Sequence, residues 1–404
     1  MNLKDYAGIS EQSDIRAIEA MAAKLAGRTI LHVNSTAVGG GVAELLSRMV
    51  PLMNGLGLNA RWEVIRGTKA FFEVTKGLHN ALQGKGKQIT KRMWDIYESV
   101  NGRNMDRMNL DADYVIIHDP QPALLVGKKK SGNWIWRCHI DISAPDRVVW
   151  HFLKGHIEKY DAAIFSVSSF AQSVSIPQYM MHPSIDPLSD KNVELSETEI
   201  AEVFNRFNIP MDKPILLQVS RFDPFKDPLG VIDAYRLVKK YHNCRLVLAG
   251  GAASDDPEGA RVLKDVLEKA GNDPDIHVLL LPPFSDKEIN ALQRGAAIVL
   301  QKSVREGFGL VVAESLWKGK PVIGGNVGGI PLQVIEGVTG FLVNSNEGTA
   351  YRIRQLLVNP EMARKMGAAG REHVRMNFLI TKDIKSYLAL CLAMEKKGES
   401  VIYL

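Results

Sequence analysis

The feature that most constrains the fold of this chain is a repeated alternation of short apolar runs with longer amphipathic stretches. Five runs rich in β-branched and aliphatic residues have the length of buried strands, and helical patterns precede or separate them. The runs are Thr29 to Val33, Arg61 to Ile65, Tyr114 to His118, Trp134 to His139 and Ala162 to Val167. The helical patterns are Ile15 to Leu25, Val42 to Leu56 and Ile89 to Val100. This alternation predicts a parallel α/β sheet.

The alternation is interrupted once and then begins again. Met180 to Pro187 is a polar run with two prolines, which favours a linker. The later strand patterns are Ile215 to Val219, Arg245 to Ala249, His277 to Leu281, Ala297 to Gln301 and Pro321 to Gly324. We therefore expect an α/β protein with two doubly wound Rossmann-like domains, residues 1–185 and 186–379. The carboxyl ends of their sheets should face a central cleft, where such folds bind ligands.

Composition excludes several classes of protein. The 404 residues carry a net charge of only +5, and acidic residues are interleaved with basic ones, so we expect a small anionic ligand and no nucleic acid. No apolar stretch approaches the roughly 20 residues of a membrane span, so we expect a cytoplasmic chain that does not bind membranes. Three cysteines lie far apart without paired spacing, which predicts reduced packing residues and no metal site.

Gly39, Gly40 and Gly41 follow the first predicted strand and precede a helix that starts near Val42. Glycines there let the backbone approach a ligand closely, and the helix N-terminus offers free N–H groups. The spacing is not that of dinucleotide folds, and no Walker lysine follows. A flexible turn explains this motif equally well.

Arg221 and Lys226 follow the strand Ile215 to Val219 and precede a helix that Asp227 and Pro228 begin. Two cations at the carboxyl end of a strand suit a diphosphate, which arginine binds as a planar fork and lysine as a point charge. They would neutralise the charge that develops on a departing nucleotide. The alternative is a surface salt bridge to Asp223 or Asp227.

Glu306 and Glu314, eight residues apart, lie on either side of a helix start that follows the strand Ala297 to Gln301. Glu306 should lie in the loop and face the cleft, while the amides of Gly309 and Leu310 point outward at the helix start. Glu314 can face the same side and accept two ribose hydroxyls. The alternative is a pair of capping, solvated glutamates.

Polar residues also close two strands of the first domain. His118 and Asp119 end one strand, and His139 and Asp141 end the next, so all four should face the cleft. A single histidine is more often structural than catalytic, but their shared location favours a ligand role.

These residues carry a resemblance to a known family. The spacing of Arg221 to Lys226 and of Glu306 to Glu314 resembles that of retaining GT-B glycosyltransferases of the glycogen synthase and sucrose synthase superfamily. Three further segments look like the trehalose glycosyltransferring synthases, and the resemblance covers nearly the whole chain. The segments are Trp136 to Asp141, Pro183 to Pro187 and Val304 to Pro321.

The resemblance implies a role for each of these residues. On the donor side, Arg221 and Lys226 would hold the diphosphate, Glu306 a glucose hydroxyl, Glu314 the ribose, and the Leu310 amide a phosphate. His139 would lie beside the donor glucose, Asp119 on the acceptor side, and the Gly40 and Gly41 backbone would line the cleft. In GT-B proteins a final helix crosses back to the first domain, which we expect of residues 380–404.

The implied reaction transfers glucose from an ADP-, UDP- or GDP-glucose donor to glucose, reversibly and with retention, and it requires no metal or other cofactor. No carboxylate presents itself as a covalent nucleophile, which favours a front-face mechanism. Two alternatives stay open: a retaining trehalose phosphorylase that uses phosphate, and a non-catalytic sensor that binds a sugar nucleotide. The base of the donor, the prevailing direction and a homodimeric state are left open by the sequence.

Overall fold

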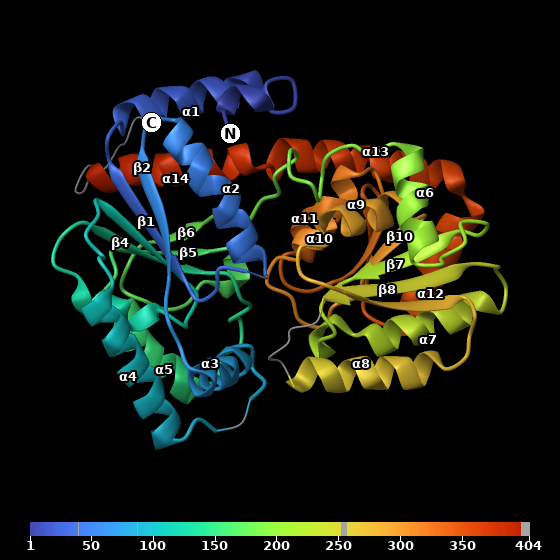
Figure 1. Cartoon of the computed structure of the whole chain (residues 1–404), viewed down its shortest axis with the longest axis horizontal. Coiled ribbons are helices and arrows are strands. Elements are labelled where there is room, and N and C mark those ends of the chain that lie inside the picture. Colours follow the sequence, from blue (N-terminus) through green and yellow to red (C-terminus); the bar gives the residue numbers. More distant parts are fainter. Residues whose placement is uncertain (39, 87, 252–256, 397–404) are drawn as a thin grey trace. The chain divides into compact units, whose positions relative to one another are not determined.

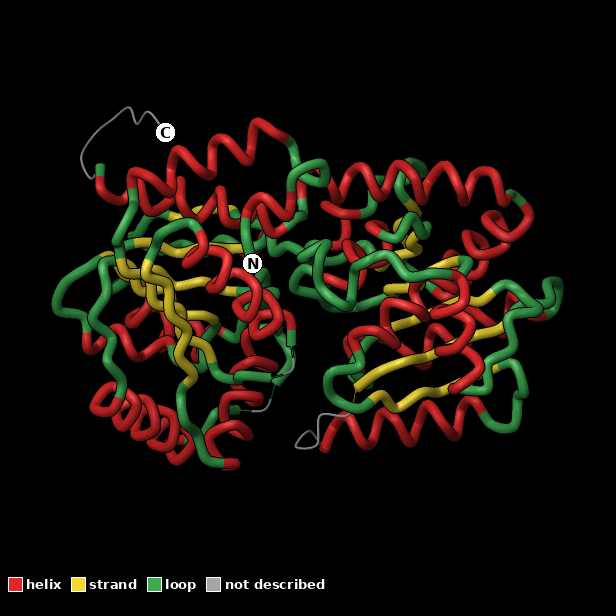
Figure 2. The backbone as a smooth tube through the Cα atoms, turned by 45° about the horizontal axis from the view of Figure 1, so that its top comes forward, coloured by secondary structure: helices red, strands yellow, loops and turns green. Residues whose placement is uncertain are grey.

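The computed structural model describes residues 1–38, 40–86, 88–251 and 257–396, and the chain divides into two units (Figure 1). The first unit holds Met1–Ser184 and the segment that begins at Ile380, and the second holds Ile185–Leu379. Each unit is built around its own parallel sheet with helices on both faces, as the alternation predicts (Figure 2). The prediction of two Rossmann-like α/β domains is confirmed.

The first unit contains a parallel sheet with the strand order β2-β1-β3-β4-β5-β6. The strands are β1 (Thr29–Asn34), β2 (Asn59–Val64), β3 (Tyr114–His118), β4 (Asn133–Cys138), β5 (Ala162–Phe165) and β6 (Gln178–Met180). The chain order reverses between β1 and β3, so the switch point of this sheet lies there. Ligands of such sheets bind at the carboxyl ends beside the switch point.

Helices cover both faces of the first sheet (Figure 1). On one face α14 (Ile380–Glu395) packs against α1 (Gln12–Lys24) and α2 (Gly41–Gly55). On the other face α3 (Lys69–Leu82) packs against α4 (Lys91–Arg107) and α5 (Arg147–Ile157). The last helix, α14, therefore completes the first unit although it follows the second in sequence.

The second unit contains a parallel sheet with the strand order β12-β11-β10-β7-β8-β9. The strands are β7 (Ile215–Val219), β8 (Arg245–Gly251), β9 (Ile276–Leu281), β10 (Ile298–Gln301), β11 (Val322–Gly325) and β12 (Gly340–Val343). This is the Rossmann order, and its switch point lies between β7 and β10.

The helices of the second unit form two layers. One layer contains α7 (Pro228–Lys239), α8 (Pro257–Ala270) and α12 (Asn346–Val358). The other layer contains α6 (Glu197–Arg206), α9 (Asp286–Gly295), α10 (Leu310–Trp317), α11 (Ile330–Gln333) and α13 (Pro360–Asn377). Side chains of α7, α8, α12 and the strands form one buried apolar cluster, which packs this layer of helices against the sheet.

Capping residues explain why several helices begin where they do. Thr90 accepts a hydrogen bond from the Met93 amide, so α4 begins at Lys91 and extends to Arg107, beyond the predicted Val100. Asp227 adopts a left-handed conformation with φ 49° and caps α7 at the Gly230 amide, with Pro228 at the first helical position as predicted. Helices α3 and α5 and strands β6 and β12 were not predicted.

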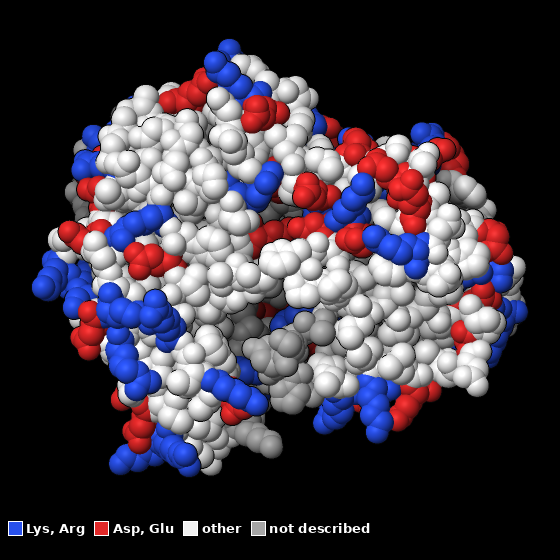
Figure 3. Space-filling view, in the orientation of Figure 1, with Lys and Arg blue, Asp and Glu red and all other residues white. Residues whose placement is uncertain are grey.

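The surface and the cysteines agree with the reading of composition. The three cysteines are buried and unpaired. On the face shown in Figure 3, basic and acidic groups lie among one another in both units. Among the described residues, no helix is both long enough and apolar enough to cross a membrane.

Candidate active site

A lysine and a glutamate meet at the switch point of the second sheet. Lys226 follows β7, Glu306 follows β10, and the Lys226 Nζ lies 2.6 Å from the Glu306 Oε2. The same oxygen accepts hydrogen bonds from Gln301 Nε2 and Ser303 Oγ, each at 3.0 Å. Three donors therefore converge on one carboxylate oxygen, where a Rossmann fold binds its ligand.

Glu306 is ionised although only 7% of its surface is exposed. Burial disfavours the charged carboxylate, but the Lys226 ammonium and the hydrogen bonds from Gln301 and Ser303 outweigh burial and lower the pKa of Glu306. Within the described chain the second oxygen, Oε1, accepts no hydrogen bond. A fixed carboxylate with one saturated and one unused oxygen can accept a hydrogen bond from a ligand hydroxyl.

The backbone around Lys226 is held by neighbouring groups. Lys226 ends the short 3₁₀ helix η4 (Pro224–Lys226), which Asp223 caps through the Phe225 amide. Gln218 Nε2, from β7, donates to the Lys226 carbonyl at 2.7 Å. The Val304 amide donates to the Phe225 carbonyl at 2.8 Å, which ties the loop after β10 to this turn. These bonds fix the backbone from which the Lys226 side chain extends.

Arg221 projects from the same strand end but is much less constrained. Its side chain is 56% exposed, and its guanidinium lies 3.7 Å from the Asp223 carboxylate. The salt bridge considered as the alternative is therefore present with Asp223, whereas Asp227 is paired with Lys302. An exposed, loosely paired guanidinium contributes little to stability and can turn towards an anion.

The loop between Glu306 and α10 is shaped by glycines. Gly309 has φ 81° and immediately precedes α10, so the first amides of that helix lack helical partners. Gly328, which sequence reasoning missed, has φ 55°, and a Cβ added to it would lie 1.9 Å from the Glu306 carbonyl oxygen. The adjacent Gly329 amide donates to the Gly307 carbonyl at 2.9 Å. Only glycine permits this close approach, which supports the loop that carries Glu306.

Glu314 lies on α10 and is 3% exposed. Its Oε2 accepts from Gln293 Nε2 at 3.1 Å, and the Lys191 ammonium lies 4.0 Å from its Oε1. It shares no hydrogen bond or ion pair with Lys226 or Glu306 in the described parts of the chain. The alternative of two solvated glutamates is wrong, because both carboxylates are buried.

Polar residues also gather at the switch point of the first sheet. Asp119, which follows β3, has φ 66°, and its Oδ1 accepts from the His139 amide at 2.7 Å. Burial raises the pKa of Asp119 to about 7, against the opposing effects of the His139 amide and the Arg137 charge. Trp136 Nε1 donates to the Asp119 carbonyl at 3.1 Å. These contacts unite Asp119 and His139, as the sequence predicts.

His139 also belongs to a chain of three imidazoles. Its Nε2 lies 2.9 Å from His118 Nδ1, and His118 Nε2 lies 3.0 Å from His32 Nδ1. His32 lies in the middle of β1 and was missed by sequence reasoning. One feature of the sequence could have pointed to His32. It lies two residues before the end of β1, and β1 is the neighbour of β3, which ends at His118.

The remaining predicted residues of the first unit have local roles in the structure. Asp141 accepts hydrogen bonds from the Ser143 amide at 2.9 Å and hydroxyl at 2.6 Å. Gly40 has φ 86° and precedes α2, which begins at Gly41. Gly39 lies outside the described residues. The positive φ explains why glycine is needed at residue 40.

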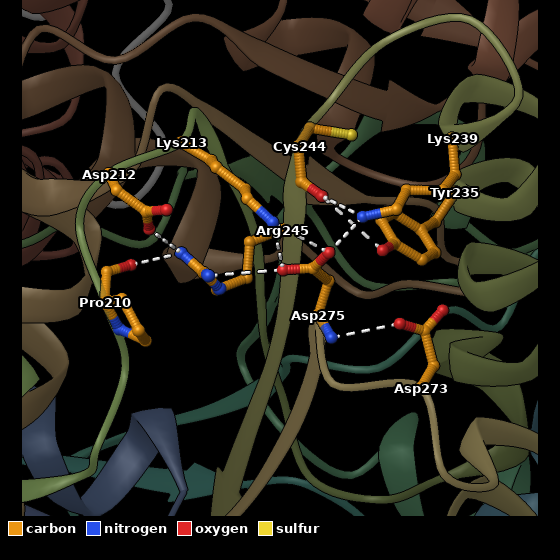
Figure 4. Close-up of polar contacts among 9 residues, drawn as sticks. All are labelled: Pro210, Asp212, Lys213, Tyr235, Lys239, Cys244, Arg245, Asp273 and Asp275. Carbon is orange, nitrogen blue, oxygen red and sulfur yellow. Dashed lines mark hydrogen bonds and ion pairs between the residues drawn. The ribbon is translucent and has the colours of Figure 1, made fainter.

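A denser group of charges lies at the opposite end of the strands of the second sheet, where the strands begin (Figure 4). Asp275 precedes β9 and contacts Lys213 at 2.9 Å, Arg245 at 3.2 Å and Lys239. Arg245 also pairs with Asp212 at 2.7 Å. Because Lys213, Arg245 and Asp275 lie where β7, β8 and β9 begin, this cluster is at the amino ends of the strands. We therefore assign it to stability and not to ligand binding.

Among the residues that the structure describes, no group of three or more His, Cys, Asp or Glu side chains could hold a metal ion.

Comparison with known proteins defines the class and the family of the chain. Residues 32–172 match the family described as "Trehalose synthase, N-terminal domain", and residues 199–373 match "Glycosyl transferases group 1". The Escherichia coli structure described as "Trehalose-6-phosphate from E. coli bound with UDP-2-fluoro glucose" is similar with a TM-score of 0.73 at 13% identity. That similarity covers 92% of this chain and 99% of the other. The two Rossmann units and these matches define a glycosyltransferase of the GT-B fold.

The sequence relatives narrow the class further. The trehalose synthase of Pyrococcus horikoshii is 47% identical over 393 residues, which cover 96% of this chain and 95% of that protein. The trehalose phosphorylase of Pleurotus pulmonarius is 29% identical, over 91% of this chain but 57% of that longer protein. The chain belongs to the trehalose synthase family.

Proposed function

We propose that this chain is a retaining glucosyltransferase that makes trehalose reversibly from a nucleoside diphosphate glucose and glucose. The observation that carries the proposal is the Lys226–Glu306 pair at the switch point between β7 and β10. A cation beside a fixed carboxylate, with a helix start next to them, suits a ligand that joins a diphosphate to a sugar. The similar Escherichia coli structure is bound with UDP-2-fluoro glucose, which supports a nucleotide donor.

In this proposal the second unit holds the donor. Lys226 and Arg221 bind the diphosphate, with the amides of Gly309 and Leu310 assisting, and Glu306 accepts a hydrogen bond from a glucose hydroxyl. Glu314 accepts from the ribose, for which its contact with Gln293 has to open or be shared.

The first unit holds the acceptor and supports the reacting centre. Asp119 binds an acceptor hydroxyl, His139 lies beside the donor glucose, and Asp141 contributes a further polar contact. The Gly40 and Gly41 backbone lines the sugar site.

The reaction proceeds on one face of the donor sugar. The bond between the anomeric carbon and the phosphate oxygen breaks, and its electron pair stays on that oxygen. The acceptor hydroxyl oxygen forms the new bond on the same face, and its proton passes to the departing phosphate oxygen. Lys226 and Arg221 stabilise the negative charge that develops there, and no covalent sugar intermediate forms.

The relatives also include a trehalose phosphorylase, so phosphate is the competing acceptor in the cleavage direction. Purified protein should be incubated with trehalose and either ADP, UDP, GDP or inorganic phosphate, and the products separated. We expect α-configured nucleoside diphosphate glucose from at least one nucleotide and no glucose 1-phosphate. Cleavage with phosphate alone would favour the phosphorylase, and a β-configured product would exclude retention. Ligand binding without any turnover would favour the sensor.

A variant of Lys226 tests its role in the site. Lys226→Met should reduce kcat about 100-fold, because the departing diphosphate loses about 3 kcal/mol of stabilisation in the transition state. Lys264→Met is the matched control, since its side chain is 74% exposed and lies on α8. Near-normal turnover of Lys226→Met would remove this residue from the diphosphate site.

A further inference from the structure

The three-histidine chain of the first unit has a geometry that the glycosyl transfer does not by itself require. His118 on β3 lies opposite Arg137 on β4 in the parallel register. His139 follows Arg137 by two residues, so its side chain lies on the same face of the sheet as those of Arg137 and His118. His32 pairs with Ile116, which lies two residues before His118. Parallel register therefore places the three imidazoles in one row, with ring centroids 5.3 Å and 5.2 Å apart.

The two ends of the three-histidine chain differ in burial. At one end, His32 Nε2 is buried and has no hydrogen-bond partner among the described residues. At that end the Tyr387 ring of α14 packs edge-on against His32, with centroids 5.6 Å apart. At the other end, His139 is partly exposed, and its Nδ1 makes no hydrogen bond within the described ranges. One end is sealed in the protein, and the other is available to a ligand.

All three imidazoles are neutral. Burial is the main cause, and the charge of Arg137 adds to it: together they lower the pKa of His32 to about 3 and that of His139 well below its ordinary value. The pKa of His118 is also well below its ordinary value, because of burial and the neighbouring rings and Arg137. Asp383 and Tyr387 of α14 are further ionisable groups packed against this face, and Asp383 lies 3.6 Å from Arg137.

A chain of neutral imidazoles has only two consistent arrangements of protons, because each ring donates through one nitrogen and accepts through the other. Either every ring carries its proton on Nδ1, or every ring carries it on Nε2. The second arrangement leaves an N–H of His32 buried without an acceptor, and orphaned buried N–H groups are the rarer kind of defect. The first arrangement leaves only a bare nitrogen there. The first arrangement is therefore favoured.

We propose that His32 and His118 are positioning residues that hold His139 as a neutral imidazole with its proton on Nδ1. The available end of the chain is then an N–H donor of fixed direction, suited to the oxygen of a sugar hydroxyl. Because the donor is uncharged, it does not oppose the positive charge that develops on the sugar ring in the transition state. The kinetic part of this inference rests on the proposed function, whereas the proton arrangement does not.

The proton arrangement can be measured without any activity. In protein labelled with ¹⁵N at histidine, correlations between the ring nitrogens and carbon-bound protons distinguish a protonated Nδ1 from a protonated Nε2. We expect a protonated Nδ1 and an unprotonated Nε2 at His139 in the ligand-free wild type. A proton on Nε2, or a doubly protonated ring at pH 7, would overturn the inference whatever the enzyme does.

Two variants whose side chains have the same number and branching of heavy atoms test the positioning role. His118→Asn keeps an N–H that can donate to His139 Nε2, whereas His118→Leu removes it. We expect His118→Leu to lose about tenfold in kcat with little change in KM, as the loss of one orienting hydrogen bond implies, and His118→Asn to remain within about threefold of the wild type. His242→Leu, at a histidine of the second unit, is the control.

The outcomes separate this inference from the proposed function. Equal losses in His118→Asn and His118→Leu would refute the positioning role, because the hydrogen bond to His139 would then make no difference to kcat. If His139 carries the expected proton in a wild type that transfers no glucose, the proposed function fails and the proton arrangement stands. If both variants fail to fold, the wild-type tautomer still decides the inference.

Discussion

Asp275 is the carboxylate on which the amino end of the second sheet depends (Figure 4). Its two oxygens contact Lys213, Lys239 and Arg245, and its side chain is 10% exposed. Replacing it with asparagine keeps the volume but leaves three cations close together without their shared anion. We therefore expect Asp275→Asn to lower the free energy of unfolding of the second unit.

The magnitude follows from the titration of this carboxyl group. Burial of Asp275 disfavours its charge, but Lys239 and Lys213 outweigh burial and lower its pKa from 3.8 to about 2. That difference corresponds to about 2 kcal/mol of stability at neutral pH. The repulsion among the unpaired cations adds to it, which gives about 3 kcal/mol in total, within the usual range for breaking a buried charge pair.

The sign of the pH dependence is fixed by the lowered pKa. A carboxyl whose folded pKa is depressed stabilises the fold above its unfolded value and loses this contribution as the pH falls through the folded value. The difference between wild type and Asp275→Asn should therefore be complete above about pH 4 and should decrease between pH 3.8 and about 2.

Calorimetry of the full chain, with hydrogen exchange to locate the change, measures this effect. A loss of about 3 kcal/mol in a unit of this size lowers its melting temperature by roughly 6–12 °C. Exchange should increase in β7, β8 and β9 and not in β1 and β3. Asp212→Asn is the control, since Asp212 is 59% exposed and should contribute under about 1 kcal/mol. A loss of less than about 1 kcal/mol in Asp275→Asn would refute the reasoning.

Three further substitutions test the candidate site. Glu306→Gln should reduce kcat about 100-fold, because Lys226 loses its anion and one hydroxyl acceptor is removed; initial rates at saturating substrates measure this. Gly328→Ala should lower both activity and melting temperature, since its Cβ would meet the Glu306 carbonyl. Gly337→Ala, also at a positive φ but in open space, should leave activity unchanged and lower the melting temperature less. The free energy of unfolding of the wild type should fall as the pH rises from about 4 to about 7, and Asp119→Asn should abolish this fall. Burial raises the Asp119 pKa to about 7, so the unfolded chain releases that proton first; urea unfolding at several pH values would show the slope.

Much of the fold follows from local patterns of the sequence. Runs such as Tyr114–His118 and Ile215–Val219 are apolar except for His118 and Gln218, and every residue in them is buried in the structure, so their strand character can be read directly. Strand β6 is three residues long and partly exposed, and strand β12 begins at a glycine, so neither has a comparable signal. The helix α3 begins after Thr68, whose cap is visible only when the following amphipathic face is recognised.

The places of Lys226 and Glu306 in the fold were predictable because each depends only on position along a strand. Lys226 and Glu306 each follow a buried strand, and the carboxyl ends of parallel strands lie on one side of the sheet. Both residues could therefore be expected on that side before the order of the strands was known. Gln301 and Ser303 could not be expected in the same way. They donate to an oxygen whose direction depends on the Glu306 loop, and Gly328 supports that loop from the turn after β11.

The two charged clusters of the second unit lie at opposite ends of the strands. For ligand binding, this position matters more than the number of charges. Asp275 gathers three cations and Glu306 only one, so charge density alone would select the Asp275 cluster as an anion site. Yet the cations around Asp275 are already paired with carboxylates, and they lie where strands begin. At Glu306 the single lysine shares its edge with an exposed arginine and the uncapped start of α10. Binding capacity therefore depends on donors that folding leaves unsatisfied, and these lie at the carboxyl ends of the strands.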